Sequence, residues 1–441
     1  MEQIGIWNKN DSIDASMLRD YGGKVIILQG MVHKIREMSG FAFVILRTHR
    51  DLVQCVYSNE SFQSKLCELQ EGCAVLVVGE VIVNEHVING AEIRISEIEV
   101  LSRPAENMPI AINRKQLDIP LDTSLSYRPI ALRNIKERAV FKIQEGIARG
   151  FREYLTHQNF TEVHTPKIVF AGAEGGANIF KLDYFGKQVY LAQSPQFYKQ
   201  TLVGTFERVF EIAAVYRAEK HDTARHLNEY ISMDFEMGFI NDHTDIMEME
   251  VGALKYIFGL LDEEYAKELS LFGVKTPEIE SIPSIKFMEA KTIIEKQYKR
   301  KVTDFYDFEP EEEQLIGNYA KTRLGSDFIF ITHYPSAKRP FYAMDDKNDP
   351  GFTKSFDLLY NGLEVTTGGQ RIHDYHEQVE KMKARGMTPE DFESYLMIHK
   401  YGMPPHGGLG AGLERLTMKL LGFNNVRYAS MFPRDINRVT P

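Results

Sequence analysis

The sequence predicts an α+β protein with two domains, a small N-terminal β-barrel and a larger domain that combines β-hairpins with long helices. Three observations support this fold class. Five short segments rich in Val and Ile lie within the first 101 residues, a charged hairpin pattern covers residues 210–239, and an amphipathic helical pattern precedes that hairpin. The chain has 441 residues, which is too long for one compact core.

The barrel is predicted from the spacing of its strands. Segments with strand composition cover residues 24–35, 40–47, 52–57, 73–84 and 87–101. A helix-like segment, 61–69, lies between the third and the fourth of them. Five strands with a helix at this position are typical of a closed barrel of the OB type. Such barrels often present a strand face to single-stranded nucleic acid.

Aromatic side chains alternate with basic and amide side chains on one predicted face of this barrel. Such a combination can stack on bases and hydrogen bond to their edges. The residues expected on this face are His33, Arg36, Phe41, Phe43, Arg47 and Gln54. A second interpretation stays open, in which Phe43 belongs to the barrel core and the charged side chains are only solvated.

Composition excludes several classes of protein. Hydrophobic residues make up 43% and charged residues 26%, and no apolar run approaches the length of a membrane span. The formal charge of −10 argues against non-specific adhesion to nucleic acid. Cys55, Cys67 and Cys73 lack metal-ligand spacing and are expected to be reduced, buried thiols. With no signal-peptide pattern, a cytoplasmic enzyme is the expected class.

Prolines at positions 104, 109, 120 and 129 mark a linker. Residues 1–104 are therefore expected to form the barrel domain, 105–132 a hinge and 133–441 the second domain. Within the second domain, residues 244–325 are largely helical in composition and are expected to form a peripheral insertion.

A long amphipathic helix opens the second domain. Its apolar residues recur at spacings of three and four, which predicts one stripe that faces either a core or a partner subunit. The stripe consists of Val140, Ile143, Ile147, Phe151 and Leu155. The next segment, 159–169, is expected to be a turn and a strand, and Pro166 within it indicates a sheet edge or an interface.

The segment 210–239 is predicted to be two strands joined by a polar loop. Arg217 and Glu219 are two residues apart and share a face if the strand continues through them, as do Asp234 and Glu236 on the return strand. A charged face beside Tyr230 is suited to a ligand with phosphates, an amine and a flat ring. The alternative is a ladder of salt bridges on an exposed sheet.

Two carboxylates and a hydroxyl surround a second predicted hairpin, whose turn signal is Asn361-Gly362. Asp357, Glu364 and Thr367 are suitable hard-oxygen ligands for Mg²⁺, which also binds substrate phosphates. A solvated acidic hairpin is the alternative. Farther along, glycines in the segment 402–412 precede a helix with Arg415 in its first turn, which predicts an anion site.

In this order, the motifs resemble the three signature motifs of class II aminoacyl-tRNA synthetases. They are the proline-bearing strand after a long helix, the Arg-x-Glu hairpin and the glycine-rich segment before Glu414-Arg415. The stretches EGGANIF, AQSPQFYKQ, TARHLNEY and TTGGQRIHD resemble the aspartyl enzymes of the archaeal and eukaryotic type. The resemblance implies an anticodon-binding OB barrel and a catalytic domain built on an antiparallel β-sheet flanked by helices.

The resemblance also implies a role for each candidate residue. ATP would meet Arg217 at its α-phosphate, Glu219 and Tyr230 at its adenine, and His226 and Arg415 at its β- and γ-phosphates. Arg217 and Arg415 would be the catalytic pair, because they neutralise charge while the amino acid's carboxylate attacks the α-phosphorus. No side-chain nucleophile is required.

The remaining roles concern the metal, the amino acid and the anticodon. Mg²⁺ would be held by Asp357, Glu364 and Thr367, with Glu364 also at the ATP. The aspartate site would contain Glu174, Ser194, Gln196, Lys199, Asp234 and Arg371. The anticodon would meet His33, Arg36, Phe43, Gln54 and Glu92. Lys199 and Arg371 would clamp a side-chain carboxylate, and a neutral asparagine would leave one of these cations unpaired, so Lys199 favours aspartate.

The expected function is therefore activation of L-aspartate with ATP and its transfer to tRNA(Asp). His33 occupies a position where relaxed relatives carry histidine, so we also expect transfer to tRNA(Asn), although the turn 84–90 lacks the proline often found in them. The helix stripe and Pro166 resemble the family's dimer-forming motif, which implies a homodimer. An asparaginyl enzyme, a paralogue without tRNA charging and a specialised duplicate stay open as alternatives.

Overall fold

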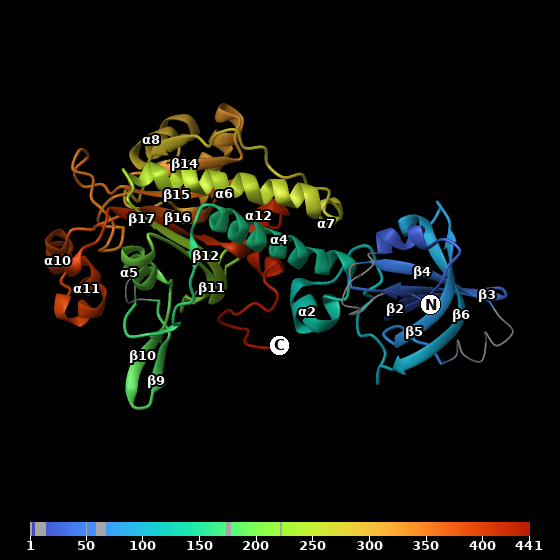
Figure 1. Ribbon diagram of the computed structural model, residues 1–441. Helices are drawn as coiled ribbons and strands as arrows, with labels where there is room; N and C mark the ends of the chain where they lie inside the picture. The colour runs from blue at the N-terminus through green and yellow to red at the C-terminus, as the bar shows by residue number, and fades with distance from the viewer. Residues whose placement is uncertain (1, 5–14, 50, 59–67, 173–177, 221–222) are drawn as a thin grey trace. The chain divides into compact units, whose positions relative to one another are not determined.

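The computed structural model describes residues 2–4, 15–49, 51–58, 68–172, 178–220 and 223–441. They form two compact units, Met1–Arg138 and Ala139–Pro441 (Figure 1). Most of the helix expected at 61–69 lies outside the described residues. No helix in the described part of the chain is long and apolar enough to cross a membrane.

The N-terminal unit is a closed β-barrel, which confirms the predicted OB-type fold. Its five main strands are β2 (Val25–Met38), β3 (Phe41–Arg47), β4 (Leu52–Tyr57), β5 (Ala74–Val83) and β6 (Ala91–Ser102). The barrel closes because β2 pairs with β3 and also with β5. Along β3 and β4 every second residue is buried, as expected for strands with one face in a core. Cys55 and Cys73 are buried free thiols, whereas Cys67 lies outside the described residues.

The second unit is built on an eight-stranded sheet with the order β13-β14-β15-β16-β17-β12-β11-β7. Its six central strands pair with one another in antiparallel orientation, and only the edge strands β13 and β7 pair in parallel. The predicted antiparallel sheet is thereby confirmed. The strands are β7 (Thr161–Glu162), β11 (Arg208–Tyr216), β12 (Glu229–Gly238), β13 (Ser284–Lys286), β14 (Phe328–Thr332), β15 (Ser355–Tyr360), β16 (Leu363–Arg371) and β17 (His406–Gly412).

Two long helices, α4 (Ile135–His157) and α6 (His243–Glu264), run together over one face of this sheet (Figure 1). The α4 stripe from Val140 to Leu155 is buried in the core of its own chain, so it faces a core and not a partner subunit. Helix α6 also differs from the peripheral placement expected for residues 244–325. Its apolar residues, among them Leu254 and Ile257, pack into the same core because they form a stripe at helical spacing.

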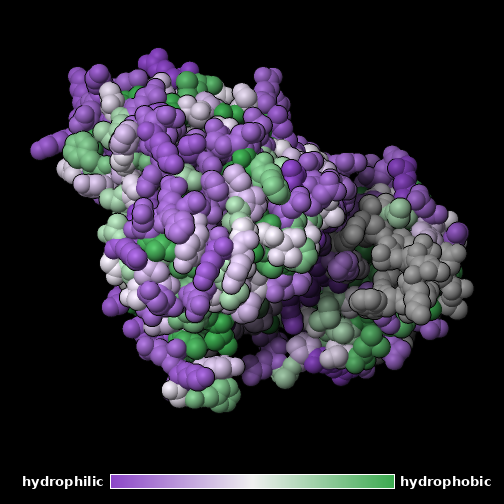
Figure 2. All heavy atoms as spheres, turned by 60° about the vertical axis from the view of Figure 1, so that its left-hand side comes forward, coloured by the Kyte–Doolittle hydropathy of each residue, from purple (hydrophilic) through white to green (hydrophobic). Residues whose placement is uncertain are grey.

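The remaining elements of the second unit surround this framework. Helices α8 and α9 pack with β13 and β14 around a separate small core, and β8, β10 and β9 form a three-stranded sheet. The bounds of these elements are β8 (Ile168–Val169), β9 (Lys181–Tyr184), β10 (Lys187–Leu191), α5 (Gln196–Phe206), α7 (Ala266–Ser270), α8 (Phe287–Tyr298), α9 (Pro310–Tyr319), α10 (Tyr375–Ala384), α11 (Glu393–Tyr401) and α12 (Leu413–Leu420). The N-terminal unit also contains two short helices, α2 (Leu121–Ser126) and α3 (Arg128–Ala131). Polar side chains cover most of the face seen in Figure 2, with apolar patches between them.

Candidate active site

A cavity of about 640 Å³ lies against the sheet. Along β12, Ser232 and Asp234 line this cavity, whereas the alternate residues Met233 and Phe235 belong to the core beneath α4 and α6. All residues predicted for ATP, aspartate and metal line it except Glu174, which lies outside the described residues. They are Ser194, Gln196, Lys199, Arg217, Glu219, His226, Tyr230, Asp234, Asp357, Glu364, Thr367, Arg371 and Arg415.

The hairpin β11–β12 has the predicted antiparallel register, with Glu211 opposite Asp234. Arg217 and Glu219 lie beyond the end of β11, where the Arg217 amide still donates a backbone hydrogen bond to the Asn228 carbonyl oxygen at 2.9 Å. The Asn228 side-chain amide donates hydrogen bonds to the carbonyl oxygens of Arg217 at 2.7 Å and Glu219 at 3.0 Å. The Arg217 guanidinium lies 5.9 Å from the centre of the Tyr230 ring. A cation and an aromatic face therefore lie side by side in the cavity.

A buried cluster of four charges lies at the end of the cavity formed by α5, β12 and β16. Lys199 Nζ is 2.8 Å from Asp234 Oδ1, 3.4 Å from Glu236 Oε2 and 2.8 Å from the Leu409 carbonyl oxygen. Arg371 Nε donates to Glu236 Oε1 at 2.9 Å, and its Nη2 donates to the Gly408 carbonyl oxygen at 2.9 Å. The cluster therefore contains two cations and two carboxylates, and each cation already has a carboxylate partner.

The neighbouring cations determine the charge of Glu236. Burial by itself would raise its pKa, but Arg371 and Lys199 lower it below the ordinary value, so the carboxyl stays ionised. His406 lies nearby and is completely buried. Burial lowers the pKa of His406 to about 3, which keeps the imidazole neutral.

The glycine-rich segment that precedes α12 is a central strand, β17, and not a loop. It lies between β16 and β12, with Gly410 opposite Asp234. A Cβ atom at Gly408 would lie 2.3 Å from Glu236 Oε2, and one at Gly410 would lie 2.9 Å from Asp234 Oδ1. These glycines therefore leave space for the two carboxylates.

The predicted metal residues lie on the adjacent strands β15 and β16, joined by a turn in which Asn361 and Gly362 both have positive φ. Asp357 is directly opposite Thr367 in the register. Thr367 Oγ1 donates to Glu364 Oε1 at 3.1 Å. Asp357 also lies 2.8 Å from Arg339 Nη2.

The charge states of these carboxyls differ. Burial raises the pKa of Asp357 to about 6, against the opposing effect of Arg339. Burial would also raise the pKa of Glu364, but Arg415, Arg339 and Arg217 bring it below its ordinary value. The described residues contain no group of three or more His, Cys, Asp or Glu that could hold a metal ion. Two carboxylates and a hydroxyl on adjacent strands are hard-oxygen donors, the type that Mg²⁺ takes together with phosphates and water.

A second set of charges surrounds Arg415 in the first turn of α12. Arg415 Nη1 is 3.0 Å from the Glu364 carbonyl oxygen and 3.5 Å from Glu364 Oε1. His226 Nε2 lies 3.7 Å from Glu219 Oε2, and burial nevertheless lowers the pKa of His226. Arg225 forms an ion pair with Glu313, and burial raises the pKa of Glu313 to about 7. The cations at this end of the cavity suit an anionic ligand.

Three residues important to this geometry had no role assigned from the sequence. Arg339, in the loop after β14, pairs with Asp357 and lies 3.9 Å from the centre of the Tyr334 ring. Both oxygens of Glu414 accept hydrogen bonds from the Ile231 amide at 3.1 Å. Glu236, noted only for its spacing, joins Lys199 to Arg371. The dipeptide Lys338-Arg339 between two apolar strands was the signal that could have indicated Arg339.

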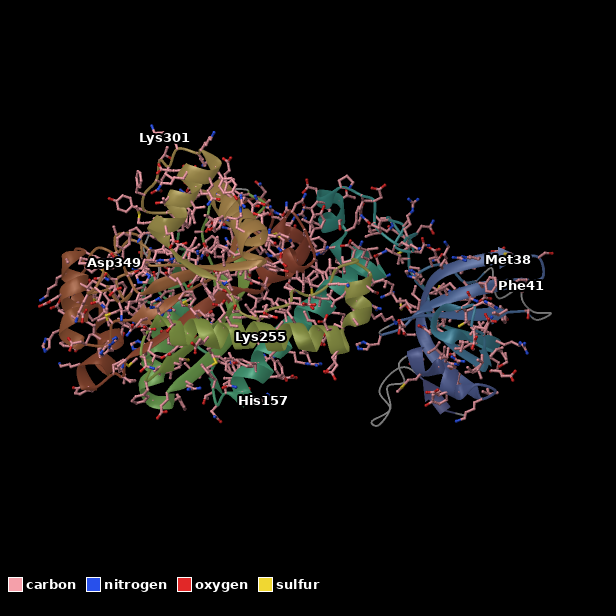
Figure 3. The ribbon with its side chains drawn as sticks, turned by 90° about the horizontal axis from the view of Figure 1, so that it is seen from above. Met38, Phe41, His157, Lys255, Lys301 and Asp349 are labelled. Carbon is pink, nitrogen blue, oxygen red and sulfur yellow. The ribbon has the colours of Figure 1, made fainter. Side chains whose placement is uncertain are left out.

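On the barrel, several predicted anticodon residues share one face. Arg36 is opposite Phe43 in the register, and the Gln54 amide donates to Glu92 Oε2 at 2.7 Å. Phe41 and Phe43 make an edge-to-face contact with ring centres 5.2 Å apart. Phe41 and Met38 flank the β2–β3 turn at the end of the barrel (Figure 3).

The placement of His33 on this face is wrong. The register of β2 against β3 shifts between Val32 and Lys34, so His33 is the extra residue of a β-bulge and is buried directly after the buried Val32. Burial and the nearby Arg47 lower the pKa of His33 to about 4. A neutral, buried imidazole is therefore not an exposed contact for a base.

Comparison with known proteins agrees with both units. A family described as tRNA synthetases class II (D, K and N) matches residues 120–436, and an OB-fold nucleic acid binding domain matches residues 26–101. A solved structure of asparaginyl-tRNA synthetase from Pyrococcus horikoshii, complexed with asparaginyl-adenylate, superimposes with a TM-score of 0.88 at 31% identity. The match covers 96% of this chain and 98% of that chain.

Two curated relatives are more similar in sequence. The aspartate–tRNA(Asp/Asn) ligase of Deinococcus radiodurans is 45% identical, and the match covers 96% of this chain and 97% of the relative. The aspartate–tRNA(Asp/Asn) ligase of Thermus thermophilus is 46% identical, with coverage of 96% and 98%. The chain therefore belongs to the class II tRNA synthetases of the D, K and N group.

Proposed function

We propose that the protein is an aspartate–tRNA ligase, which activates L-aspartate with ATP and transfers it to tRNA. The observation that carries this proposal is the buried cluster of Lys199, Arg371, Asp234 and Glu236. Its two cations and two carboxylates balance before a ligand arrives, so an incoming amino acid must exchange ion pairs within it.

Aspartate fits this exchange. The ammonium group of aspartate would bind Asp234, and Asp234 would then no longer neutralise Lys199. The side-chain carboxylate of aspartate would take the place of Asp234 as the partner of Lys199, beside Arg371. Asparagine supplies the same ammonium group but a neutral amide, so Lys199 would lose half of its buried neutralisation without replacement. Gln196 and Ser194 at the start of α5, together with Glu174, would orient the ammonium and the backbone of the amino acid.

ATP would occupy the other end of the cavity. Arg217 would bind the α-phosphate, with the adenine on Tyr230 and its amino group at Glu219. His226 and Arg415 would meet the β- and γ-phosphates. Asp357, Glu364 and Thr367 would hold Mg²⁺, which when bound supplies charge neutralisation on the phosphates.

In the first reaction, an oxygen of the amino acid's carboxylate forms a bond to the α-phosphorus, and the bond to the β-phosphate oxygen breaks to release pyrophosphate. In the second reaction, a hydroxyl of the terminal tRNA adenosine attacks the aspartyl carbonyl carbon and AMP leaves. The chain acts by orienting the reactants and by placing Arg217 and Arg415 where negative charge develops.

The choice between aspartate and asparagine is tested by pyrophosphate exchange with each amino acid. We expect exchange with aspartate to exceed exchange with asparagine by at least about 100-fold, because a site with a buried unpaired charge rejects the neutral analogue. Exchange that only asparagine drives would overturn the proposal in favour of an asparaginyl enzyme.

We further propose that the enzyme charges both tRNA(Asp) and tRNA(Asn). The names of the relatives from D. radiodurans and T. thermophilus support this range. Side-by-side aminoacylation of the two purified tRNAs tests it, and charging of tRNA(Asp) alone would restrict the function. We also propose that the protein acts in the cytoplasm, where ATP, aspartate and tRNA are all present.

Anticodon recognition is assigned to the barrel, residues 1–104, with 105–132 as a hinge and 133–441 as the catalytic domain. The proposed contacts are Arg36, Phe43, Gln54 and Glu92. We expect Phe43→Ala to raise the KM for tRNA about tenfold through lost base stacking, without an effect on pyrophosphate exchange.

A homodimer is also proposed. Pro166 is exposed, and beside it Ile168 and Phe170 leave 48% and 45% of their surface accessible. An exposed apolar patch of this kind suits an interface between subunits. Sedimentation that shows only monomer at micromolar concentration would contradict the dimer.

A further inference from the structure

Strand β16 contains a bulge between its proposed metal residues. Leu358 of β15 is opposite Thr366 and Leu359 is opposite Glu364, so Val365 is an extra residue without a partner in the register. In a regular strand, residues three apart point to opposite faces. The extra residue instead places Glu364 and Thr367 on the same face, where their side chains lie 3.1 Å apart.

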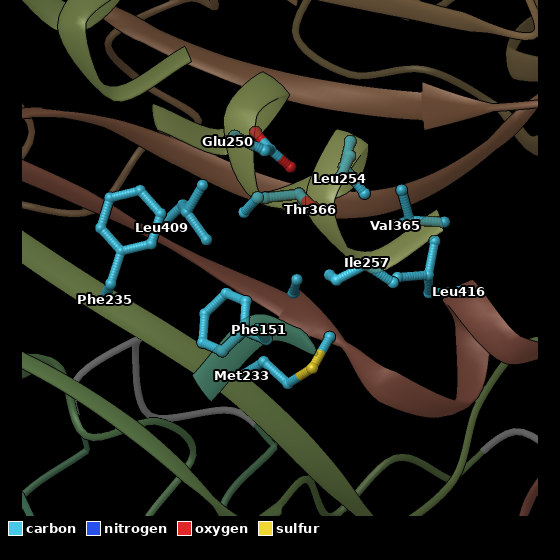
Figure 4. A pocket seen from close by; sticks show the side chains of 12 residues that line it. Phe151, Met233, Phe235, Glu250, Leu254, Ile257, Val365, Thr366, Leu409 and Leu416 are labelled. Carbon is cyan, nitrogen blue, oxygen red and sulfur yellow. The ribbon is translucent and has the colours of Figure 1, made fainter. Parts of the chain in front are cut away.

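Thr366 is adjacent to Thr367 in the regular part of the strand and therefore points to the opposite face of the sheet. There Thr366 and Glu250 of α6 line a small cavity of about 20 Å³ whose other lining residues are apolar, among them Leu254 and Phe235 (Figure 4). The Glu250 side chain makes a hydrogen bond to the Thr366 side chain. Glu250 is 4% exposed, and among the described residues its Oε2 has no hydrogen-bond partner.

Burial of a carboxyl in apolar surroundings costs stability, and an apolar side chain would fill the cavity better. We therefore expect this carboxyl to have a function. Glu250 is not in the ion pairs of the large cavity, and burial raises its pKa to about 8. It is therefore a neutral hydrogen-bonding group at neutral pH, and its hydrogen bond is directed at the residue between Val365 and Thr367.

We propose that Glu250 is a positioning residue: its hydrogen bond to Thr366 holds the Val365 bulge from beneath the sheet and so maintains the spacing of Glu364 and Thr367. The inference rests on the proposed function, in which these two residues bind the magnesium complex of ATP. Without the hydrogen bond, β16 can relax toward the regular register, which rotates one of the two ligands out of the cavity.

The experiment compares two disrupting variants with two matched controls. Glu250→Leu and Thr366→Val each remove one partner of the hydrogen bond while retaining most of the side-chain volume. Glu250→Gln and Thr366→Ser retain a hydrogen-bonding group at the same positions. Calorimetric titration measures the Kd of the magnesium complex of a non-hydrolysable ATP analogue and, separately, the Kd of L-aspartate.

We expect each disrupting variant to weaken binding of the nucleotide about tenfold, as expected for loss of one hydrogen bond of about 1.4 kcal/mol. The double variant Glu250→Leu/Thr366→Val should be no weaker than either single variant, because both lose the same interaction. The control variants and aspartate binding should stay within about twofold of the wild type.

Unchanged nucleotide binding in Glu250→Leu would overturn the inference, as would an equal loss of nucleotide and aspartate binding, which indicates a general disturbance of the fold. Additive losses in the double variant would also overturn it. Failure of the wild type to bind aspartate would instead overturn the proposed function, and the nucleotide titrations would still test the role of Glu250.

Discussion

Along β12, Asp234 and Glu236 belong to the charged site of the large cavity, whereas Met233 and Phe235 at the alternate positions pack beneath α4 and α6. The same strands therefore separate a cavity of about 640 Å³ lined by charges from a core whose cavity is only about 20 Å³. One face has room for substrates, and the other is packed almost without space.

This difference indicates how the sheet supports buried charge. Ion pairs such as Lys199–Asp234 lose solvation on burial and contribute little net stability. The apolar face contributes the burial that keeps the strands in register, so the charged groups stay where substrates need them. Substitution of a partly exposed charged residue such as Arg217 should therefore change activity with little change in stability, and substitutions on the apolar face should do the reverse.

The largest effect is expected for Arg217→Gln on the charged face. Loss of the cation at the α-phosphate should lower kcat/KM for pyrophosphate exchange by about 1000-fold, in the range found when one preorganised charge-stabilising group is removed. The thermal midpoint should stay near that of the wild type, since Arg217 lies beyond β11 at the rim of the hairpin. A variant with nearly full exchange activity would remove Arg217 from the proposed catalytic pair.

Leu254→Ala should instead lower the stability of the protein, because it removes packing on the apolar face. Leu254 is 5% exposed and lines the small cavity, so truncation enlarges an existing void (Figure 4). We expect the free energy of unfolding to fall by about 3 kcal/mol, measured by urea denaturation. The exchange activity of the remaining folded protein should be nearly unchanged, and Leu254→Met serves as the volume-conserving control. A large loss of activity without loss of stability would contradict the separation of the two faces.

Regular elements of both faces could be predicted from sequence because their periodicity is local. The α4 stripe from Val140 to Leu155, the β11–β12 hairpin and the five barrel strands all follow spacing rules that hold within a single element. The pair Asp234 and Glu236 was likewise recognised from its two-residue spacing.

Features that depend on a distant partner could not be predicted in this way. Glycine is rare in strands, so the sequence did not predict strand β17, and the space needed by the carboxylates of Asp234 and Glu236 explains Gly410 and Gly408. A prediction from spacing assumes that successive strand residues alternate between the two faces. The β-bulge at His33 interrupts this alternation, so His33 is buried although the spacing placed it on the exposed face. Arg339 acquires its role only through Asp357, a residue of another strand.

A smaller effect is expected for Lys199→Met on the charged face. Removal of the ammonium group should raise the KM for aspartate about 100-fold, in the range of a lost buried charge-assisted hydrogen bond. The KM for ATP should change less than threefold, because Lys199 lies at the amino-acid end of the cavity. An equal rise in both KM values would indicate a collapse of the cavity and not the loss of a specific contact.

The smallest effect concerns Glu250, the one carboxyl in the lining of the small apolar cavity. Its pKa is raised to about 8 when folded, against an ordinary value near 4.5, because burial disfavours the charged form. The folded state thus binds a proton that the unfolded state releases, so the contribution to stability is complete below pH 4.5 and is lost as pH rises toward 8. Relative to Glu250→Gln, which cannot titrate, wild-type unfolding free energy should fall by about 2 kcal/mol between pH 5 and 7, measured by denaturant titration. If the unfolding free energies of the two proteins changed with pH in parallel, Glu250 would already be ionised in the folded state. The two faces of the sheet would then differ less in polarity than their geometry indicates.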